Sequence, residues 1–381
     1  MLFSFTLFSC LLFAVYGALI AWYHKAWRAL PVFQPRTAAL RTRISVLIPA
    51  RNEENNIGVC LRSLAAQRYP RDLFEVIVID DHSMDRTAAV VKDFSTLPVR
   101  YLSLAAISSA ETITSHKKFA IETGIGAATG ELIVTTDADC TFDPEWLGTL
   151  AAFYEQQGAK FIAAPVRIGG GRNSILEIFQ TLDFITLQGI TGAAVSRRIH
   201  SMCNGANLAY PREVFYAVGG FRGIDQIPSG DDMLLMHKIF LQYPERVFFL
   251  KHRQAIVSTR PETRWKGFFN QRIRWASKAD RYDDKRIFWV LLLVYLVNAL
   301  FLALAAGAFW NSWWGLLLLI LLAAKTMVEV PFVSDVAAFF GQRRLMVYFP
   351  FFQPLHITYT LIAGWLGKFG SYRWKDRKIV K

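Results

Sequence analysis

Residues 131–140 read ELIVTTDADC, an apolar run that ends in two carboxylates one residue apart. The run is typical of a buried strand, because aliphatic and β-branched residues follow one another without a polar break. Like charges held this close repel each other, so stability does not explain Asp137 and Asp139. A hard divalent cation would remove the repulsion and leave positions for phosphate oxygens. The alternative is a solvated turn before the next helix.

The segments before this stretch alternate strand with helix. The predicted strands are ISVLIP (44–49), FEVIVID (74–80) and VRYLSL (99–104), and the helical patterns cover 55–67, 86–94 and 117–129. Continuous apolar strands separated by amphipathic helices predict a mostly parallel sheet covered on both faces. Ligands of such sheets bind beyond the carboxyl ends of the strands. ARNEE, DDHSMD and DADC all fall at those ends.

Part of the chain is expected to lie in lipid, because 53% of its 381 residues are hydrophobic. Residues 2–23 form an uncharged apolar run that is long enough to span a bilayer as a helix. A signal peptide is the alternative, but the run lacks a basic start and a clear cleavage site. We therefore expect a retained transmembrane anchor over residues 1–24.

A second membrane region is predicted over residues 286–367. The runs 287–310 and 314–333 are expected to span the bilayer, with Lys325 and Glu329 paired at i and i+4 towards the bundle interior. The run that begins at Leu345 is a third spanning, re-entrant or interfacial segment. A full span there would export the basic tail 368–381, against the positive-inside rule, so we expect this tail to be cytoplasmic.

The net charge of +13 does not by itself indicate nucleic acid. Many basic residues flank apolar runs, as His24, Lys25, Arg28, Arg343 and Arg344 do, which is typical of cytoplasmic segments facing anionic lipid. The sequence holds no nucleic-acid module, so we expect no nucleic-acid partner. The four cysteines have no CxxC spacing and predict neither a disulfide framework nor a zinc site.

Two further loops at strand ends carry acidic groups. In DDHSMDRT (80–87), Asp80 and Asp81 can accept hydrogen bonds from a nucleobase or ribose, or one side chain can cap the next helix. In PARNEE (49–54), Pro49 stiffens the turn and Glu53 is suited to a first helical turn. Neither a G-x-G-x-x-G motif nor a P-loop follows this strand, which argues against dinucleotide enzymes and P-loop phosphotransferases.

Two motifs follow later in the chain. SGDDM (229–233) places Asp231 and Asp232 before a helical run, where Asp231 can cap the helix, or a carboxylate can act as general base for a hydroxyl nucleophile. QRIRW (271–275) precedes the second membrane region. At helical spacing its Gln271, Arg274 and Trp275 share a face, where the guanidinium can bind diphosphate and the indole can stack on a sugar. The alternative is an interfacial basic and aromatic belt.

Taken together, these motifs resemble glycosyltransferase family 2, the inverting nucleotide-sugar enzymes, over about residues 42–280. The matching stretches are IPARNEE, VIDDHSMDRT, KKFAIETGIGAATGE, TTDADC, NGANLAYPREVFYAVGGF, SGDD and QRIRW. The last motif and the apolar flanks resemble the membrane-bound branch, which includes cellulose, chitin and hyaluronan synthases and ceramide glucosyltransferase. The resemblance implies a cytosolic α/β domain with the Rossmann-like GT-A fold over residues 42–280, between N- and C-terminal transmembrane helices.

The resemblance also implies site roles. The nucleotide-sugar site would be formed by Pro49, Ala50, Glu53, Asp80, Asp81, Lys117, Asp137 and Asp139. Asp139, together with Asp137, would hold Mg²⁺ or Mn²⁺. Asp232 aligns with the catalytic base, and Asp231 stands where many relatives have Glu. Gln271, Arg274 and Trp275 would close over the diphosphate and acceptor. Glu122 stands where many relatives carry Asn, and no role is assigned to it.

We therefore expect a membrane-bound inverting glycosyltransferase that moves a sugar from a UDP-sugar to a lipid or membrane-associated glycan acceptor. Transfer would be a metal-assisted single displacement with an Asp base. The alternative is a processive β-polysaccharide synthase, and product size separates the two. A decayed scaffold or a transporter fits less well, because the carboxylates are intact and lie in the soluble part. We expect an integral protein of the bacterial cytoplasmic membrane with its catalytic domain facing the cytosol.

Overall fold

A computed structural model describes residues 2–36, 40–109, 113–170, 174–199, 202–277, 285–370, 372–374 and 377–379. Its contacts divide the chain into two units. The sheet unit comprises Leu30–Gly169 and His200–Arg260, and the helical unit comprises Met1–Ala29, Gly170–Ile199 and Pro261–Lys381. The predicted α/β fold class is confirmed in the sheet unit, and the domain boundaries drawn from sequence stay a prediction.

A seven-stranded sheet forms the core of the sheet unit. In spatial order its strands are β3 (Val99–Ser103), β2 (Phe74–Asp80), β1 (Ile44–Ala50), β4 (Leu132–Thr135), β7 (Leu208–Pro211), β5 (Phe161–Ala163) and β8 (Val247–Phe249). The four strands from β3 to β4 run parallel, as predicted. β7 runs antiparallel to both β4 and β5, so the sheet is mixed rather than parallel throughout. A separate parallel pair joins β6 (Val166–Ile168) to β9 (Val257–Thr259).

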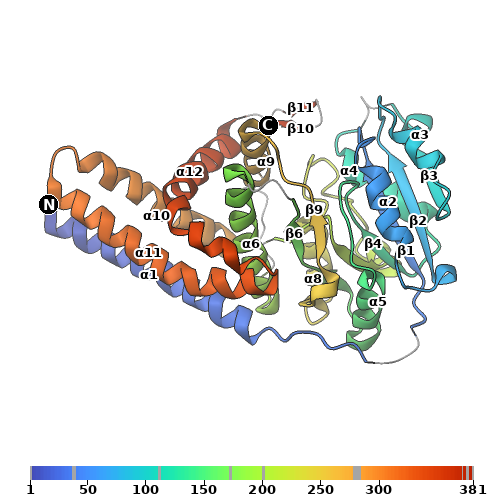
Figure 1. The fold of residues 1–381 in the computed structure, drawn as a ribbon, viewed down its shortest axis with the longest axis horizontal. Helices are drawn as coiled ribbons and strands as arrows, with labels where there is room; N and C mark the ends of the chain where they lie inside the picture. The colour runs from blue at the N-terminus through green and yellow to red at the C-terminus, as the bar shows by residue number, and fades with distance from the viewer. Residues whose placement is uncertain are drawn as a thin grey trace. The chain divides into compact units, whose positions relative to one another are not determined.

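The predicted strands coincide with β1, β2, β3 and β4, which lie side by side in Figure 1. Their residues are almost all buried in β1, β2 and β4, which explains the unbroken apolar runs. In the register, Ala50 pairs with Asp80, and Asp80 pairs with Ser103. The carboxyl ends of three neighbouring strands therefore lie at one edge of the sheet.

Helices of the sheet unit connect these strands. They are α2 (Ile57–Ala65), α3 (Thr87–Lys92), α4 (His116–Ala127), α5 (Trp146–Gln157), α7 (Arg212–Ala217) and α8 (Met233–Gln242), with short 3₁₀ turns at Arg71–Leu73, Leu104–Ala106 and Arg253–Ala255. α4 packs closely on the sheet, because a Cβ at Gly124 would lie 2.9 Å from Ile79 Cδ1. This contact fixes the helix relative to β2.

Three helices of the helical unit are long and apolar enough to cross a membrane. They are α1 (Leu2–Ala29), α10 (Lys285–Gly307) and α11 (Ser312–Phe339), which run alongside one another in Figure 1. The remaining elements are α6 (Ile175–Ser196), α9 (Trp265–Ala276), α12 (Gln353–Phe369), the 3₁₀ turns Arg343–Tyr348 and Pro350–Phe352, and the hairpin β10 (Tyr372–Trp374) and β11 (Arg377–Ile379). The predicted spans thus coincide with three observed helices.

The two charges predicted inside the third span form a buried pair. Lys325 Nζ lies 2.7 Å from Glu329 Oε1 and donates to Gln353 Oε1 at 2.6 Å. Gln353 Nε2 donates to Glu329 Oε2 at 2.6 Å, and the Tyr16 hydroxyl donates to the same carboxylate. This network joins α1, α11 and α12 at one point. It also pairs the two charges with each other, and a charge in lipid is costly unless it is paired.

The segment after α11 does not continue as a full spanning helix. Residues 343–352 form 3₁₀ turns, and α12 is too short to count among the candidate spans of the described chain. Pro350 begins the second 3₁₀ turn, and Pro354 lies in the first turn of α12, where the missing backbone donor is tolerated. Of the basic tail 368–381, residues 371, 375, 376, 380 and 381 lie outside the described residues.

α6 belongs to the helical unit although the sequence places it within the predicted soluble domain. A Cβ at Gly189 would lie 2.5 Å from Val336 Cγ2 of α11, so the two helices approach closely at this glycine. Nearly the whole length of α6 is buried. An apolar helix hidden on most sides is typical of a packed core rather than of a solvent-facing surface.

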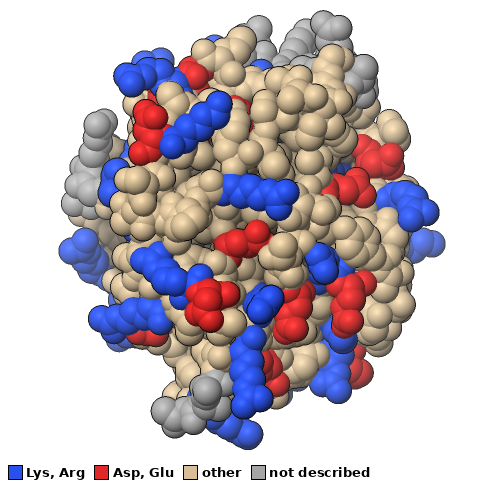
Figure 2. Space-filling view, turned by 90° about the vertical axis from the view of Figure 1, so that its right-hand side faces the viewer, with Lys and Arg blue, Asp and Glu red and all other residues tan. Residues whose placement is uncertain are grey.

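Charged side chains are mixed on the face drawn in Figure 2. Lysine and arginine lie between aspartate and glutamate there, so the formal net charge of +13 is not gathered into one patch on that face. This interspersed pattern is typical of a solvated protein surface.

Candidate active site

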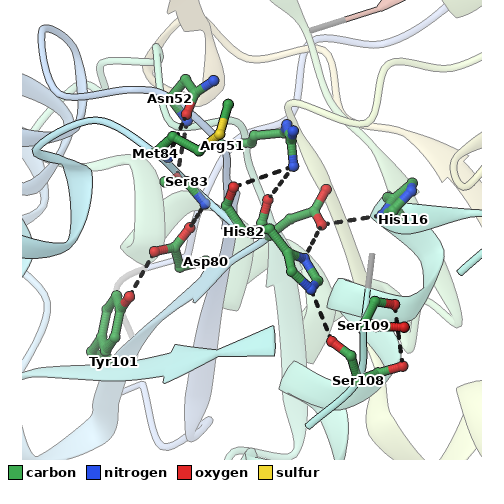
Figure 3. Close-up of polar contacts among 11 residues, drawn as sticks. Arg51, Asn52, Asp80, His82, Ser83, Met84, Tyr101, Ser108, Ser109 and His116 are labelled. Atoms are coloured by element: carbon green, nitrogen blue, oxygen red, sulfur yellow. Dashed lines mark hydrogen bonds and ion pairs between the residues drawn. The ribbon is translucent and has the colours of Figure 1, made fainter. Parts of the chain in front are cut away.

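The loops after β1 and β2 are joined by hydrogen bonds. Arg51 Nη1 donates to the carbonyl oxygens of Asp81 at 2.8 Å and His82 at 3.3 Å. Asn52 N donates to Ser83 Oγ at 3.0 Å (Figure 3). Both Asn52 and His82 have positive φ, so each loop turns sharply at the strand end. The loops after β1 and β2 thereby form one ordered rim at the carboxyl ends of these strands.

The predicted residues of the first loop lie along this rim. Pro49 and Ala50 are the last residues of β1, and the Ala50 carbonyl accepts from Asp81 N at 2.8 Å. Glu53 N donates to Thr87 Oγ1 at 2.7 Å, and its carboxylate accepts from Asn56 at 2.6 Å. Glu53 therefore lies before α2, which begins at Ile57, rather than in its first helical turn as predicted, and its backbone ties this loop to the start of α3.

Asp80 and Asp81 have different surroundings, which the sequence did not distinguish. Asp80 is buried, and its carboxylate accepts from Ser83 N at 2.9 Å and from the Tyr101 hydroxyl at 2.6 Å. Burial, and then the hydrogen bond to Asp80, raise the pKa of Tyr101 to about 12. One oxygen of Asp80 thus holds the turn in which Asp81 lies, and the other links that turn to Tyr101 of β3.

Asp81 lies between two imidazoles. Its Oδ1 is 3.0 Å from His82 Nδ1 and 3.1 Å from His116 Nδ1, while His82 Nε2 is 2.9 Å from the Ser108 carbonyl oxygen (Figure 3). Both ring nitrogens of His82 therefore face oxygens. His116 brings the first turn of α4 to the end of β2.

Lys117 links two predicted carboxylates that are far apart in the sequence. Its Nζ donates to Asp137 Oδ1 at 2.7 Å and lies 3.3 Å from Asp231 Oδ2. Burial alone would lower the pKa of Lys117, but the charges of Asp137 and Asp231 outweigh it and hold this pKa above its usual value. The ammonium therefore stays charged between the end of β4 and the start of α8.

The D-x-D pair lies beyond β4 rather than inside it. β4 ends at Thr135, and Cys140 N donates to the Asp137 carbonyl at 3.2 Å across the turn, so strand alternation does not set the two directions. Asp139 Oδ2 accepts from Thr259 Oγ1 of β9 at 3.0 Å. The pair is thus held from two sides, by Lys117 and by β9.

The surroundings of the D-x-D pair suit a cation. Burial, and then the charges of Asp139 and Asp137, raise the pKa of the Cys60 and Cys140 thiols. The charges of the two carboxylates therefore act on both thiols, in addition to burial. Among the described residues no group of three or more His, Cys, Asp and Glu is arranged to hold a metal. A cation held by the pair would therefore need further oxygen ligands from a bound molecule or water.

Asp232 is the N-cap of α8. Its Oδ1 accepts from Met233 N at 2.8 Å, and its Oδ2 accepts from Gly205 N at 3.2 Å. The capping role first considered for Asp231 belongs to Asp232, and Asp231 instead faces Lys117. These contacts place the predicted base beside the loop that contains Gly205.

Three residues of this site are not identified by the sequence motifs alone. A Cβ at Gly205 would lie 3.0 Å from Lys117 Nζ and 3.1 Å from Asp231 Oδ2, so a side chain there would crowd both charged groups. His116 and Lys118 flank Lys117 and make their own long-range contacts. The run of basic residues His116, Lys117 and Lys118 could have indicated these contacts, because basic side chains within one helical turn need acceptors nearby.

The predicted motif on α9 makes contacts within the helical unit. Arg272, which lies between the predicted residues, is 3% exposed and lies 2.7 Å from Asp183 Oδ2. It donates to Gln271 Oε1 at 2.6 Å and lies 4.2 Å from the centre of the Trp275 ring. The indole thus stacks on a guanidinium of the protein. Arg274 is partly buried, and its part in diphosphate binding stays a prediction.

Comparisons with known proteins agree with this geometry. Residues 45–219 match the protein family described as Glycosyl transferase family 2. The probable glycosyltransferase YdaM of Bacillus subtilis is 30% identical over 244 residues, covering 61% of this chain and 54% of the relative. The poly(ribitol-phosphate) β-N-acetylglucosaminyltransferase TarS of Staphylococcus aureus is 30% identical over 262 residues, or 68% of this chain and 41% of the relative. The chain spans about half the length, or less, of these relatives.

A solved structure covers nearly the whole chain. The mannosyltransferase PcManGT from Pyrobaculum calidifontis, in complex with GDP-Man and Mn²⁺, aligns with a TM-score of 0.62 and 19% identity over 96% of this chain and 99% of that chain. At this identity the similarity concerns the fold. Residues 45–219 therefore match a glycosyl transferase family 2 domain, and the seven-stranded sheet has a GT-A fold.

Proposed function

We propose that this protein is a membrane-bound inverting glycosyltransferase that moves a sugar from a nucleotide-sugar donor to a lipid or membrane-associated acceptor. The observation that carries the proposal is the contact of Lys117 with both Asp137 and Asp231. It joins the acidic end of β4 to the acidic start of α8 inside a family 2 domain. Donor-binding and base-bearing groups have to be adjacent for a transfer reaction.

The donor is proposed to bind along the rim formed by the loops after β1 and β2. Asp81, held by His82 and His116, would accept from the nucleobase or ribose, and Pro49, Ala50 and Glu53 would line the same region. Lys117 would then donate to the diphosphate. We favour a UDP-sugar by resemblance, and the GDP-Man bound to PcManGT makes GDP-sugars the competing donors to test.

Asp139 and Asp137 are proposed to hold Mg²⁺ or Mn²⁺. The negative potential at Cys60 and Cys140 fits a cation there, and the complex of PcManGT contains Mn²⁺. Such a metal would neutralise charge that builds on the departing diphosphate.

Asp232 is proposed to act as the general base. It would take the proton of the acceptor hydroxyl while the hydroxyl oxygen attacks the anomeric carbon. The bond from that carbon to the diphosphate breaks on the opposite side, and the electron pair leaves with the nucleoside diphosphate. One such displacement inverts the anomeric configuration, so an α-linked donor gives a β-linked product. Asp231, held by Lys117, would help to orient the donor.

The acceptor is proposed to come from the membrane. Two candidate spans, α10 and α11, separate the segment after α1 from the segment after α11. Both segments would therefore lie on one side of the bilayer. Lys25 and Arg28 lie near the end of α1, Arg343 and Arg344 follow α11, and positive residues mark the cytoplasmic side. We therefore propose a protein of the bacterial cytoplasmic membrane whose family 2 domain faces the cytosol.

The experiment is a donor and product assay on the full chain in bacterial phospholipid vesicles. UDP-glucose, UDP-N-acetylglucosamine and GDP-mannose are supplied with Mn²⁺, and release of UDP or GDP is measured. Release with one donor, together with a labelled short glycolipid, is the expected result. A long labelled polymer would favour the processive synthase. No release from any nucleotide-sugar, by protein that binds neither UDP nor GDP, would contradict the proposal.

A further inference from the structure

A loop held by two lysines leads into Asp231 and Asp232. Residues 218–229 form turns and bends without helix or strand. Lys118 Nζ donates to three carbonyl oxygens of this loop, those of Ile224 at 2.7 Å, Ile227 at 2.7 Å and Ser229 at 3.0 Å. Lys238 Nζ donates to two earlier ones, those of Gly220 at 2.6 Å and Arg222 at 2.9 Å. The loop is therefore ordered by side chains from outside it.

Lys118 is unusual because it is only 1% exposed. Burying an ammonium group is costly unless its protons are hydrogen-bonded. The group has three N–H donors, and the three loop carbonyls match that number. The half of the loop nearest to Asp231 is thus tied to one atom of α4.

The position of Lys118 connects this loop to the rest of the site. It is adjacent to Lys117, whose ammonium contacts Asp137 and Asp231. α4 itself is fixed on the sheet through the close approach at Gly124. A displacement of the loop relative to α4 would move Asp231 and Asp232 away from the end of β4.

We propose that Lys118 is a positioning residue for the transfer reaction. By holding the carbonyls of residues 224–229, it sets the distance between the base Asp232 and the donor bound at Asp137. The inference rests on the proposed function. A purely structural role would instead make Lys118 equivalent to Lys238, which holds carbonyls of the same loop farther from the base.

The test compares Lys118→Met with Lys238→Met in the full chain, with the donor that the wild type uses. Lys118→Met is expected to lower kcat by about 100-fold, because misplacing a reacting group by about 1 Å has that effect. Its donor KM and its affinity for UDP or GDP are expected to stay within about threefold of wild type, because the donor contacts proposed along the rim after β1 and β2 do not involve this loop. Lys238→Met is expected to keep kcat within about threefold of wild type.

A double variant separates positioning from general damage. If Lys118 acts through Asp232, then Lys118→Met adds no further loss of kcat to Asp232→Asn. Equal losses in the two lysine variants, losses that multiply in the double variant, or a Lys118→Met enzyme with wild-type kcat would each overturn the inference. A wild type that turns over no donor would contradict the proposed function instead.

If Lys118→Met does not fold, Lys118→Gln keeps a neutral donor at the same place. Propylammonium added to Lys118→Ala also returns an ammonium to the vacated space. Recovery of kcat by propylammonium, at unchanged donor KM, supports the inference. A folded Lys118→Ala enzyme with wild-type kcat refutes it.

Discussion

Replacing Asp232 by Asn tests the proposed base with a change of almost no volume. In the structure, Oδ1 accepts from Met233 N at 2.8 Å and Oδ2 accepts from Gly205 N at 3.2 Å. The asparagine oxygen can satisfy only one of these donors, and its NH₂ group then faces the other. The variant therefore loses one hydrogen bond to a charged acceptor as well as the base.

These two losses have different sizes. A hydrogen bond to a charged group contributes about 1.5–3 kcal/mol to stability. For a domain of this size class that lowers the melting temperature by roughly 3–12 °C. Removal of a general base lowers kcat by about 10²–10⁴-fold, which corresponds to about 2.7–5.4 kcal/mol in the barrier. We therefore expect a folded, slightly less stable protein that binds donor and does not turn it over.

The assay measures release of nucleoside diphosphate, with melting temperature and UDP or GDP affinity on the same samples. Asp225→Asn is the matched control, because it makes the same chemical change at an exposed position of the loop before α8. It is expected to keep wild-type kcat. If Asp232→Asn retained kcat within about tenfold of wild type, the assignment of the base would be wrong.

Four other substitutions test the remaining parts of the structure. Asp139→Ala should remove the Mn²⁺ dependence of UDP or GDP binding in calorimetry, and unchanged affinity with Mn²⁺ would contradict its role in the metal site. Arg272→Met leaves Asp183 buried without its ion pair and should cost about 3–5 kcal/mol, seen as a lower melting temperature in detergent. Gly189→Leu should destabilise by at least about 1–3 kcal/mol, because a Cβ there would already lie 2.5 Å from a methyl carbon of α11. Gly126→Ala, with nothing within 4 Å, should instead stabilise α4 by about 0.5–1 kcal/mol, and destabilisation there would refute the packing described.

The sequence by itself determined strands β1 to β4 and the three helices that are long and apolar enough to cross a membrane. Unbroken apolar runs fit strands buried on both faces, and β1, β2 and β4 have that burial. Runs of apolar residues long enough for a bilayer likewise coincide with α1, α10 and α11. These features depend on periodicity and composition, which are local properties of the chain.

Only the tertiary structure decided which side chains meet. Asp80 and Asp81 are neighbours in sequence, yet one organises a turn with Tyr101 and the other contacts His116. The partners of buried charges were the hardest to predict from the sequence. Lys118 donates to carbonyl oxygens that are 106, 109 and 111 residues away along the chain. Hydrogen-bond partners at such separations are set by how helices pack on the sheet, because burial forces each charged group to find an acceptor that its own neighbours along the chain do not supply.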